Sequence, residues 1–175
     1  MNICILAPRY PFPENGGDVL RINQVARYLK GRGHRLTLVA FRQTDLTVPD
    51  VEHLYDEIVT VHRNRWFAAF HILTGLLRGR PMQRGYYMSR EYGRAFRQVI
   101  ANRHFDLYIS HLVRMIPYLE ENGLCDRSIV EMTDALSKTY ELAIRAKGGG
   151  MLKYIYMVER GLIKRYEQYV IGRFP

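Results

Sequence analysis

The residues best suited to chemistry in this sequence follow short apolar runs that have the character of buried strands. Gly16 and Gly17 follow the first run, His111 follows the run at 106–110, and Asp134 follows the run at 128–132. Adjacent glycines let backbone N–H groups approach a ligand closely. A histidine can hydrogen-bond a ligand or share a proton near neutral pH. These residue types would suit the binding and activation of a polar or phosphorylated substrate.

The glycine pair precedes a helical pattern, in which Asp18 is the expected N-cap and Arg21 lies in the first turn. A helix N-terminus presents unpaired N–H donors and a positive dipole end, which favour phosphate, and Arg21 adds charge. The dinucleotide fingerprint G-x-G-x-x-G and the P-loop ending in Gly-Lys-Ser/Thr are both absent. From the local sequence, a glycine pair that only turns the chain is an equally good interpretation.

The other two residues also have structural alternatives. His111 could cap the short helix that is expected to start near Val113, although a functional role is slightly favoured. Asp134 could be the N-cap of the next helix, and such a role does not exclude a place in a binding site. His34 is interpreted as a turn residue that leads into a strand.

Strand-like and helix-like patterns alternate along the whole chain, and no linker or repeat divides it. Strands are expected at 2–7, 35–41, 57–61, 106–110 and 128–132, and helices at 19–30, 66–77, 90–102, 113–121, from 134 onward and at 151–171. This alternation predicts an α/β fold: a doubly wound, mostly parallel, Rossmann-like sheet with helices on both faces. Such sheets bind ligands at the carboxyl ends of their strands, where the residues above would gather.

The composition is that of an ordinary globular domain, with 47% apolar and 25% charged residues. The net charge of +9 favours an anionic partner, which could be nucleic acid, an anionic membrane surface or a phosphorylated substrate. Cys4 and Cys125 lack metal-ligand spacing and suggest no disulfide framework, so we expect no metal and a reducing cytoplasm. The N-terminus lacks the features of a signal peptide.

Several loose motifs occur in a fixed order. Between Ile5 and Val39 the order is Pro11-x-Pro13, Gly16-Gly17, Arg21, Leu29 and Gly33-His34. This segment resembles the opening of glycosyltransferase family 4, which comprises retaining enzymes of the GT-B architecture. The run from Phe105-Asp106 to His111 resembles that family's Asp-strand-His segment. The runs 79–87 and 131–140 resemble the branch that serves exopolysaccharide systems, so the resemblance extends over nearly the whole chain.

The resemblance implies a role for each candidate residue. Gly16 and Gly17 match a loop between the two domains, near the donor phosphates and the acceptor, and Arg21 matches a position beside it. His111 matches a histidine beside the transferred sugar, and Asp134 a polar residue near the cleft. The implied substrates are a nucleotide sugar and a glycan or lipid-linked acceptor, without a metal or other cofactor. Residues 1–175 would form the N-terminal, acceptor-side domain. The C-terminal nucleotide-sugar domain would be absent from this chain, which alone would not turn over.

That second domain carries a Glu-x7-Glu pair in the family, and Glu159 and Glu167 have this spacing. We do not interpret them as that pair. Eight residues along a helix leave two side chains about 80° apart, and the pair lies in the last expected helix of the first domain.

A basic and aromatic segment gives a further candidate surface. Its expected helix at 66–77 is flanked by arginines and begins on an aromatic residue, and the residues singled out are Arg63, Arg65, Trp66, Arg78 and Arg80. Such a helix could lie in a membrane interface with its arginines on anionic lipid, at the inner membrane face, or contact the acceptor. The slightly favoured alternative is a buried helix packed on the sheet.

Two other classes of function were weighed. A basic α/β module that binds nucleic acid would agree with the charge, but the basic residues are scattered and no RNA-binding signature is present. A nicotinamide-dependent oxidoreductase is disfavoured by the missing fingerprint.

Overall fold

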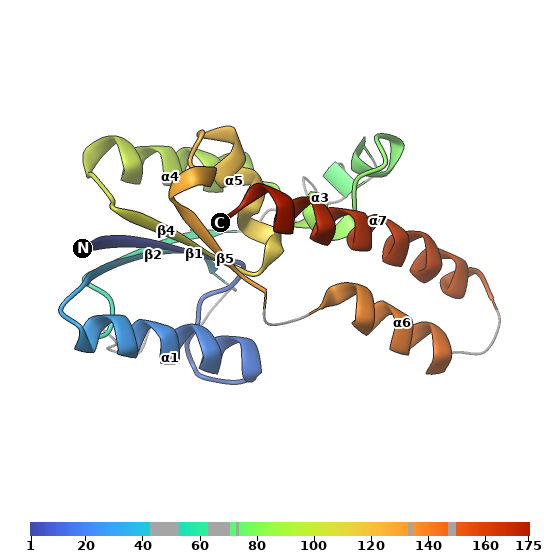
Figure 1. The fold of residues 1–175 in the computed structure, drawn as a ribbon, viewed down its shortest axis with the longest axis horizontal. Coiled ribbons are helices and arrows are strands. Elements are labelled where there is room, and N and C mark those ends of the chain that lie inside the picture. The colour runs from blue at the N-terminus through green and yellow to red at the C-terminus, as the bar shows by residue number, and fades with distance from the viewer. Residues whose placement is uncertain (43–52, 63–70, 73, 133–134, 147–149) are drawn as a thin grey trace.

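The computed structural model describes residues 1–42, 53–62, 71–72, 74–132, 135–146 and 150–175, and its centre is a five-stranded parallel sheet (Figure 1). The strand order is β3-β2-β1-β4-β5. Every described pair of neighbouring strands is parallel. The strands are β1 (Asn2–Ala7), β2 (Arg35–Arg42), β3 (Glu57–His62), β4 (Leu107–His111) and β5 (Ser128–Glu131). The predicted α/β fold with a parallel, Rossmann-like sheet is confirmed.

Helices cover both faces of this sheet. One face carries α1, and the other carries α4 and α5 (Figure 1). The labelled helices are α1 (Gly17–Gly31), α3 (Met82–Tyr86), α4 (Arg90–Asn102), α5 (Ile116–Glu121), α6 (Leu136–Ala146) and α7 (Met151–Arg173). Residues 71–72 and 74–77 are also helical, and short 3-10 turns occupy Val113–Met115 and Cys125–Arg127.

The apolar strand residues divide between two cores because side chains alternate along a strand. Ile3 and Ile5 of β1 pack toward Ile22 of α1, and Cys4 and Leu6 pack toward the opposite face. On that opposite face the aromatic side chains of α4 and α5 fill the core. They include Tyr92, Phe96 and Tyr118, with the Tyr92 and Tyr118 rings 4.5 Å apart. A strand buried on both faces needs a continuous apolar run, as the sequence of β1 indicated.

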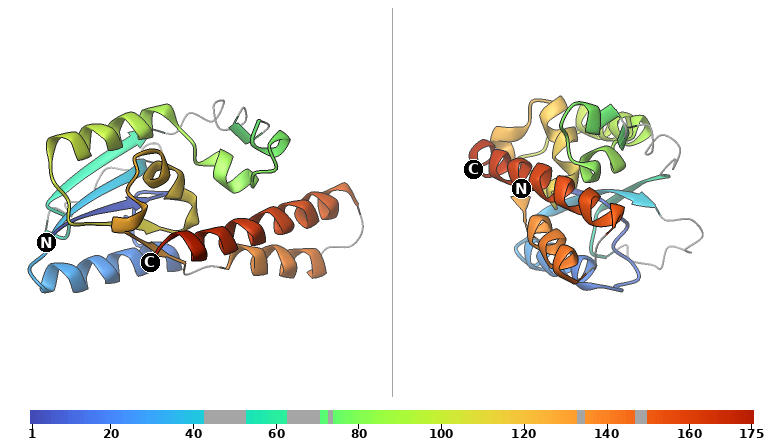
Figure 2. Two further views of the ribbon diagram at one scale, coloured as in Figure 1. Left: turned by 45° about the horizontal axis from the view of Figure 1, so that its top comes forward. Right: turned by 90° about the vertical axis from the view of Figure 1, so that its right-hand side faces the viewer.

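The last two helices form a hairpin that extends beyond the sheet, with α6 and α7 side by side (Figure 2). The base of the hairpin joins the body through a third core, in which Ile163 and Val170 of α7 pack with Ile116 and Leu136. Further out, the rings of Tyr140 and Tyr156 lie 5.6 Å apart and join the two helices. The outer half of α7 therefore lies away from the sheet.

The segment that precedes α3 differs from the favoured prediction. Its described residues at 71–72 and 74–77 are half-buried or exposed, and Leu77 is 83% exposed. They pack against α3, where a Cβ added to Gly85 would lie only 2.6 Å from the His71 carbonyl oxygen. The prediction of a helix packed on the sheet is wrong for this part, because its neighbours are α3 and the outer half of α7.

Glu159 and Glu167 bind the amino ends of two different helices. The Glu159 carboxylate accepts hydrogen bonds from the Met82 and Gln83 N–H groups at 2.9 and 3.1 Å, where α3 begins. Glu167 accepts a hydrogen bond from the Ser137 N–H at 3.2 Å, in the first turn of α6. Each carboxylate thus supplies an acceptor for N–H groups that have no partner within their own helix.

Candidate functional site

The sheet changes winding direction between β1 and β4. From β1 the chain continues to β2 and β3 on one side, and β4 and β5 then extend the sheet on the other side. The loops after β1 and β4 therefore leave the carboxyl edge at the crevice where doubly wound sheets bind their ligands. Gly16 and Gly17 follow β1 here, and His111 ends β4.

His111 lies opposite Glu131 in the parallel register of β4 and β5. Both side chains point to the sheet face that α1 covers, because Ile109, two residues before His111, packs in the core beneath α1. His111 Nδ1 is 2.8 Å from Glu131 Oε2, and the histidine side chain is only 3% exposed. The His111 side chain on β4 is therefore bound to the Glu131 side chain on the neighbouring strand β5. The 3-10 turn that follows has Leu112 as its N-cap and no side-chain cap, so the capping alternative is wrong.

Arg21 completes this arrangement from α1. Its Nε donates to Glu131 Oε1 at 2.7 Å, so a single carboxylate holds the arginine on one oxygen and the histidine on the other. We call Arg21, Glu131 and His111 the edge cluster. The sequence predicted Arg21 and His111 but missed Glu131. The available signal was that Glu131 is the last residue of a strand-like run, and the structure adds the register that sets it beside His111.

The carboxylate of the edge cluster is held in its charged form. Burial raises the pKa of Glu131, but the hydrogen bonds from His111 and Arg21 outweigh it, so the pKa lies below its usual value. A charged carboxylate on Nδ1 requires the histidine proton to be on that nitrogen. The lone pair of the neutral ring is then on Nε2, which is buried and has no hydrogen-bond partner among the described residues.

A histidine held in this way can accept a hydrogen bond or a proton from a ligand hydroxyl through Nε2. Arg21 is suited to an anion, because its side chain is 55% exposed and its Nη groups carry donors beyond the Nε–H that Glu131 uses. Since Nε2 is enclosed by protein, a ligand reaches it only when the covering groups move. The cluster thus offers a proton acceptor and a cation at one edge of the sheet.

The glycine loop begins α1 in a backbone conformation that needs glycine. Gly16 is the N-cap of α1, with φ of +118°, so Asp18 is not the N-cap that the sequence predicted. Asp18 lies in the first turn and pairs with Arg9, whose Nε donates to Asp18 Oδ2 at 2.8 Å. Burial raises the pKa of Asp18, and the bonds from Arg9 and from backbone N–H groups bring it below its usual value. A carboxylate therefore already lies at this helix N-terminus.

Asn23, a fully buried residue of α1, anchors the loop that precedes the glycines. Its Nδ2 donates to the Pro11 carbonyl and to Glu14 Oε1, both at 2.9 Å. Its Oδ1 accepts a hydrogen bond from the Tyr55 hydroxyl at 3.0 Å. The amide thereby links residues 11–14 to α1 and to the segment before β3, which gives the loop a defined path.

The two glycines should respond oppositely to alanine. At Gly16 a Cβ would lie 2.9 Å from Arg9 Nη2 and the positive φ is strained for any other residue, so Gly16→Ala is expected to destabilise the chain by about 1–3 kcal/mol. At Gly17 a Cβ meets nothing within 4 Å, so Gly17→Ala is expected to stabilise it by about 0.4–1 kcal/mol. Urea unfolding of both variants measures the difference. Equal effects at the two positions would show that the loop does not have this conformation.

Among the described residues, no other candidate from the sequence belongs to the edge cluster. Asp134, Arg63, Arg65 and Trp66 are outside the described residues. Arg78 and Arg80 are exposed in the segment that precedes α3, and they are not part of the edge cluster. Within the described part of the chain, no group of three His, Cys, Asp or Glu side chains could hold a metal ion.

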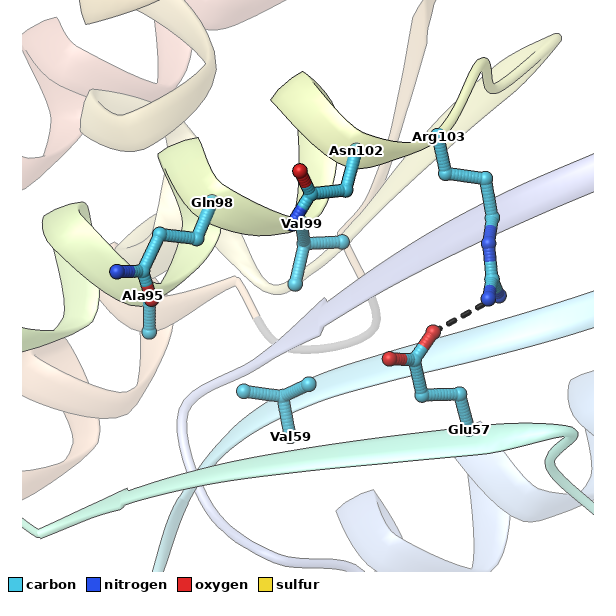
Figure 3. A pocket seen from close by; sticks show the side chains of 7 residues that line it. All are labelled: Glu57, Val59, Ala95, Gln98, Val99, Asn102 and Arg103. Carbon is cyan, nitrogen blue, oxygen red and sulfur yellow. Dashed lines mark ion pairs between the residues drawn. The ribbon is translucent and has the colours of Figure 1, made fainter.

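A cavity of about 230 Å³ between α4 and β3 is not part of this site (Figure 3). An ion pair closes one end of it, with Arg103 Nη1 2.8 Å from Glu57 Oε2. Glu57 begins β3, and Arg103 precedes the start of β4, so this closed end of the cavity lies at the amino ends of the strands. Its residues are Glu57, Val59, Ala95, Gln98, Val99, Asn102 and Arg103. The edge cluster lies at the opposite ends of the strands.

Comparisons with models of protein families, with curated proteins and with solved structures found no match for this chain.

Proposed function

We propose that this chain is the acceptor-side domain of a retaining, nucleotide-sugar-dependent glycosyltransferase. Its acceptor would be a glycan or lipid-linked molecule in polysaccharide or glycoconjugate biosynthesis, handled on the cytoplasmic side of the membrane. The observation that carries the proposal is the edge cluster, in which Arg21, Glu131 and His111 meet at the winding change of a parallel sheet. Arg21 comes from α1, the helix that starts at the glycine pair. The ordered sequence motifs that resemble glycosyltransferase family 4 agree with it.

The residues can be matched to the needs of the reaction. Sugar transfer from a nucleotide sugar builds positive charge on the sugar ring and negative charge on the departing diphosphate. In the proposal, the Gly17 N–H group and the Nη groups of Arg21 face the diphosphate, because the Asp18 carboxylate already accepts hydrogen bonds from the Asp18 and Val19 N–H groups. His111 hydrogen-bonds a hydroxyl of the transferred sugar through Nε2, and Glu131 keeps the ring in the required tautomer. Glu131 is thus a positioning residue, because it acts through the histidine and the arginine.

The remaining parts of the proposal rest on the resemblance. A second α/β domain would bind the nucleotide and close the cleft over the glycine loop, and catalysis would need no metal ion. In this proposal the acceptor-side domain binds the acceptor, and sugar transfer requires both domains.

Gly17→Asp is the variant that tests the role of the loop. Since nothing lies within 4 Å of a Cβ at Gly17, and an acidic residue is favourable in the first turn of a helix, the fold should be retained. In the complete protein, the new carboxylate should lower the transfer rate by at least about 100-fold, because it repels the charge that develops on the leaving diphosphate. Release of nucleoside diphosphate from a panel of nucleotide sugars measures the rate.

Gly17→Asn is the matched control, because it adds a side chain of the same size without the charge. It should retain most of the activity, which assigns the loss in Gly17→Asp to electrostatic repulsion. If Gly17→Asp transfers sugar at the unchanged rate, the loop does not face the diphosphate.

A further inference from the structure

The outer half of α7 carries an apolar surface that the protein leaves exposed. Met151, Tyr154, Ile155 and Val158 recur at the spacing that gathers side chains on one face of a helix. Met151 is 81% exposed and Tyr154 is 70% exposed. We call these four residues the hairpin stripe. Both figures of the fold show this half of α7 beyond the sheet, beside α6 (Figures 1 and 2).

Across a groove, the hairpin stripe faces the segment that precedes α3 and the start of α3 itself. Leu76 and Met82 form the other wall of an apolar groove of about 250 Å³. Among the described residues that line it, the only charged group is the Glu159 carboxylate, which is held by the Met82 and Gln83 N–H groups. At the end of the neighbouring segment Leu77 is almost fully exposed. The stripe and the groove together form an apolar area at one end of the molecule, and Leu77 is a further exposed apolar side chain next to Leu76.

The sequence of the hairpin carries an excess of positive charge. Over residues 136–165 the sequence has seven lysines and arginines and only two glutamates. Of those two, Glu159 is buried, and Glu141 is paired with Lys138, Arg145 and Arg160. Arg78 and Arg80 are exposed directly after Leu77. An exposed apolar stripe in a cationic segment matches the chemistry of an anionic membrane interface.

We propose that the hairpin stripe and Leu77 dock onto an anionic lipid bilayer, with the apolar side chains at the acyl boundary and Arg78 and Arg80 on headgroup phosphates. Among the described helices, none is long and apolar enough to cross a membrane, so the contact is interfacial. A second copy of the chain is a poorer occupant, because each copy carries a net charge of +9 and two such surfaces repel each other. This surface shares only Arg78 and Arg80 with the basic segment singled out from the sequence. It does not depend on the proposed catalytic function.

Cosedimentation of the full chain with lipid vesicles tests the proposal. The chain should bind vesicles that contain phosphatidylglycerol, bind those of phosphatidylcholine alone much more weakly, and lose binding as salt is added. Changing Met151 and Tyr154 together to serine should weaken binding by about tenfold or more. Changing Arg78 and Arg80 to glutamine should cost about fivefold per arginine on the anionic vesicles.

The control pair is Tyr28→Ser with Ile171→Ser, which removes two side chains that are 62% and 70% exposed and lie outside the hairpin stripe. Both pairs keep the net charge and should keep the helical circular dichroism. Three results would overturn the proposal: equal binding to both vesicle types, an equal loss in the control pair, or a dimer in solution that only the Met151 and Tyr154 pair disrupts. The last would identify a second copy as the occupant.

Discussion

Replacing Glu131 by glutamine is expected to lower the free energy of unfolding at pH 7 by about 2 kcal/mol, because two hydrogen bonds to a charged, largely buried carboxylate are lost or weakened. Glu131 Oε1 and Oε2 bind Arg21 and His111, and the side chain of Glu131 is only 13% exposed. An amide offers only one, uncharged acceptor, so Arg21 keeps a weaker hydrogen bond, and His111 keeps one only if its tautomer changes so that Nδ1 accepts from the amide NH2. Urea unfolding of the chain measures the change.

The loss in Glu131→Gln should depend on pH with a definite sign. The pKa of Glu131 lies below its usual value in the folded chain, so its contribution is present above about pH 4.5 and is lost as the pH falls through the folded pKa. The wild type and the variant should therefore approach each other in stability as the solution is acidified.

Glu57→Gln is the control for that variant. Glu57 begins β3 and, like Glu131, pairs with an arginine. The side chains of Glu57 and Arg103 are, however, 40% and 49% exposed. Such a pair contributes under about 1 kcal/mol. If Glu131→Gln costs no more than Glu57→Gln, the edge cluster is not a buried network.

Replacing Glu159 by glutamine should cost about 1–3 kcal/mol, because one of the Met82 and Gln83 N–H groups then faces an amide NH2 and stays unsatisfied. These groups connect α7 to α3, so the variant should also loosen the segment beside the hairpin stripe. Urea unfolding gives the total loss, and amide exchange at Met82 and Gln83 locates it.

The pH dependence of Glu159→Gln should be the reverse of that of Glu131→Gln. Burial raises the pKa of Glu159, and the two backbone N–H groups only partly oppose it. A raised folded pKa means that the stability contribution is present below about pH 4.5 and declines as the pH rises through the folded pKa. The difference between wild type and variant should therefore shrink toward neutral pH. A difference that grows with pH would contradict the assigned burial of this carboxylate.

Local patterns were enough to predict most of the fold. The helix at 90–102 has the predicted bounds, and Gly31 and Gly33 end α1 as expected, because periodicity and glycine punctuation act within a few residues. The five-residue helix α3 was missed because it is too short to show a period. It is held by Glu159, 77 residues from Met82, and such a contact is invisible to a local pattern.

In the candidate site, too, residues that local patterns mark were predicted, and residues that depend on long-range contacts were missed. His111 was predicted because it follows a strand-like run. Arg21 was predicted because it lies in the first turn of the helix that follows the first strand. Glu131 was missed because its role depends on the pairing of β4 with β5 and on the sheet face that α1 covers. Neither strand order nor register can be predicted from the sequence of a single strand. Asp18 was wrongly predicted as the N-cap. Its partner Arg9 lies on the preceding loop, and a loop has no periodic pattern from which this ion pair could be predicted.

The most direct test of the central claim is sugar transfer by the complete protein, measured for the wild type and for His111→Ala with a panel of nucleotide sugars and a membrane extract as acceptor source. The proposed function predicts that the wild type releases nucleoside diphosphate from at least one donor and retains the anomeric configuration of the sugar. It predicts that His111→Ala, folded by circular dichroism, transfers at least about 100-fold more slowly. A wild type that transfers from no donor, or a His111→Ala variant that transfers at the wild-type rate, would contradict it.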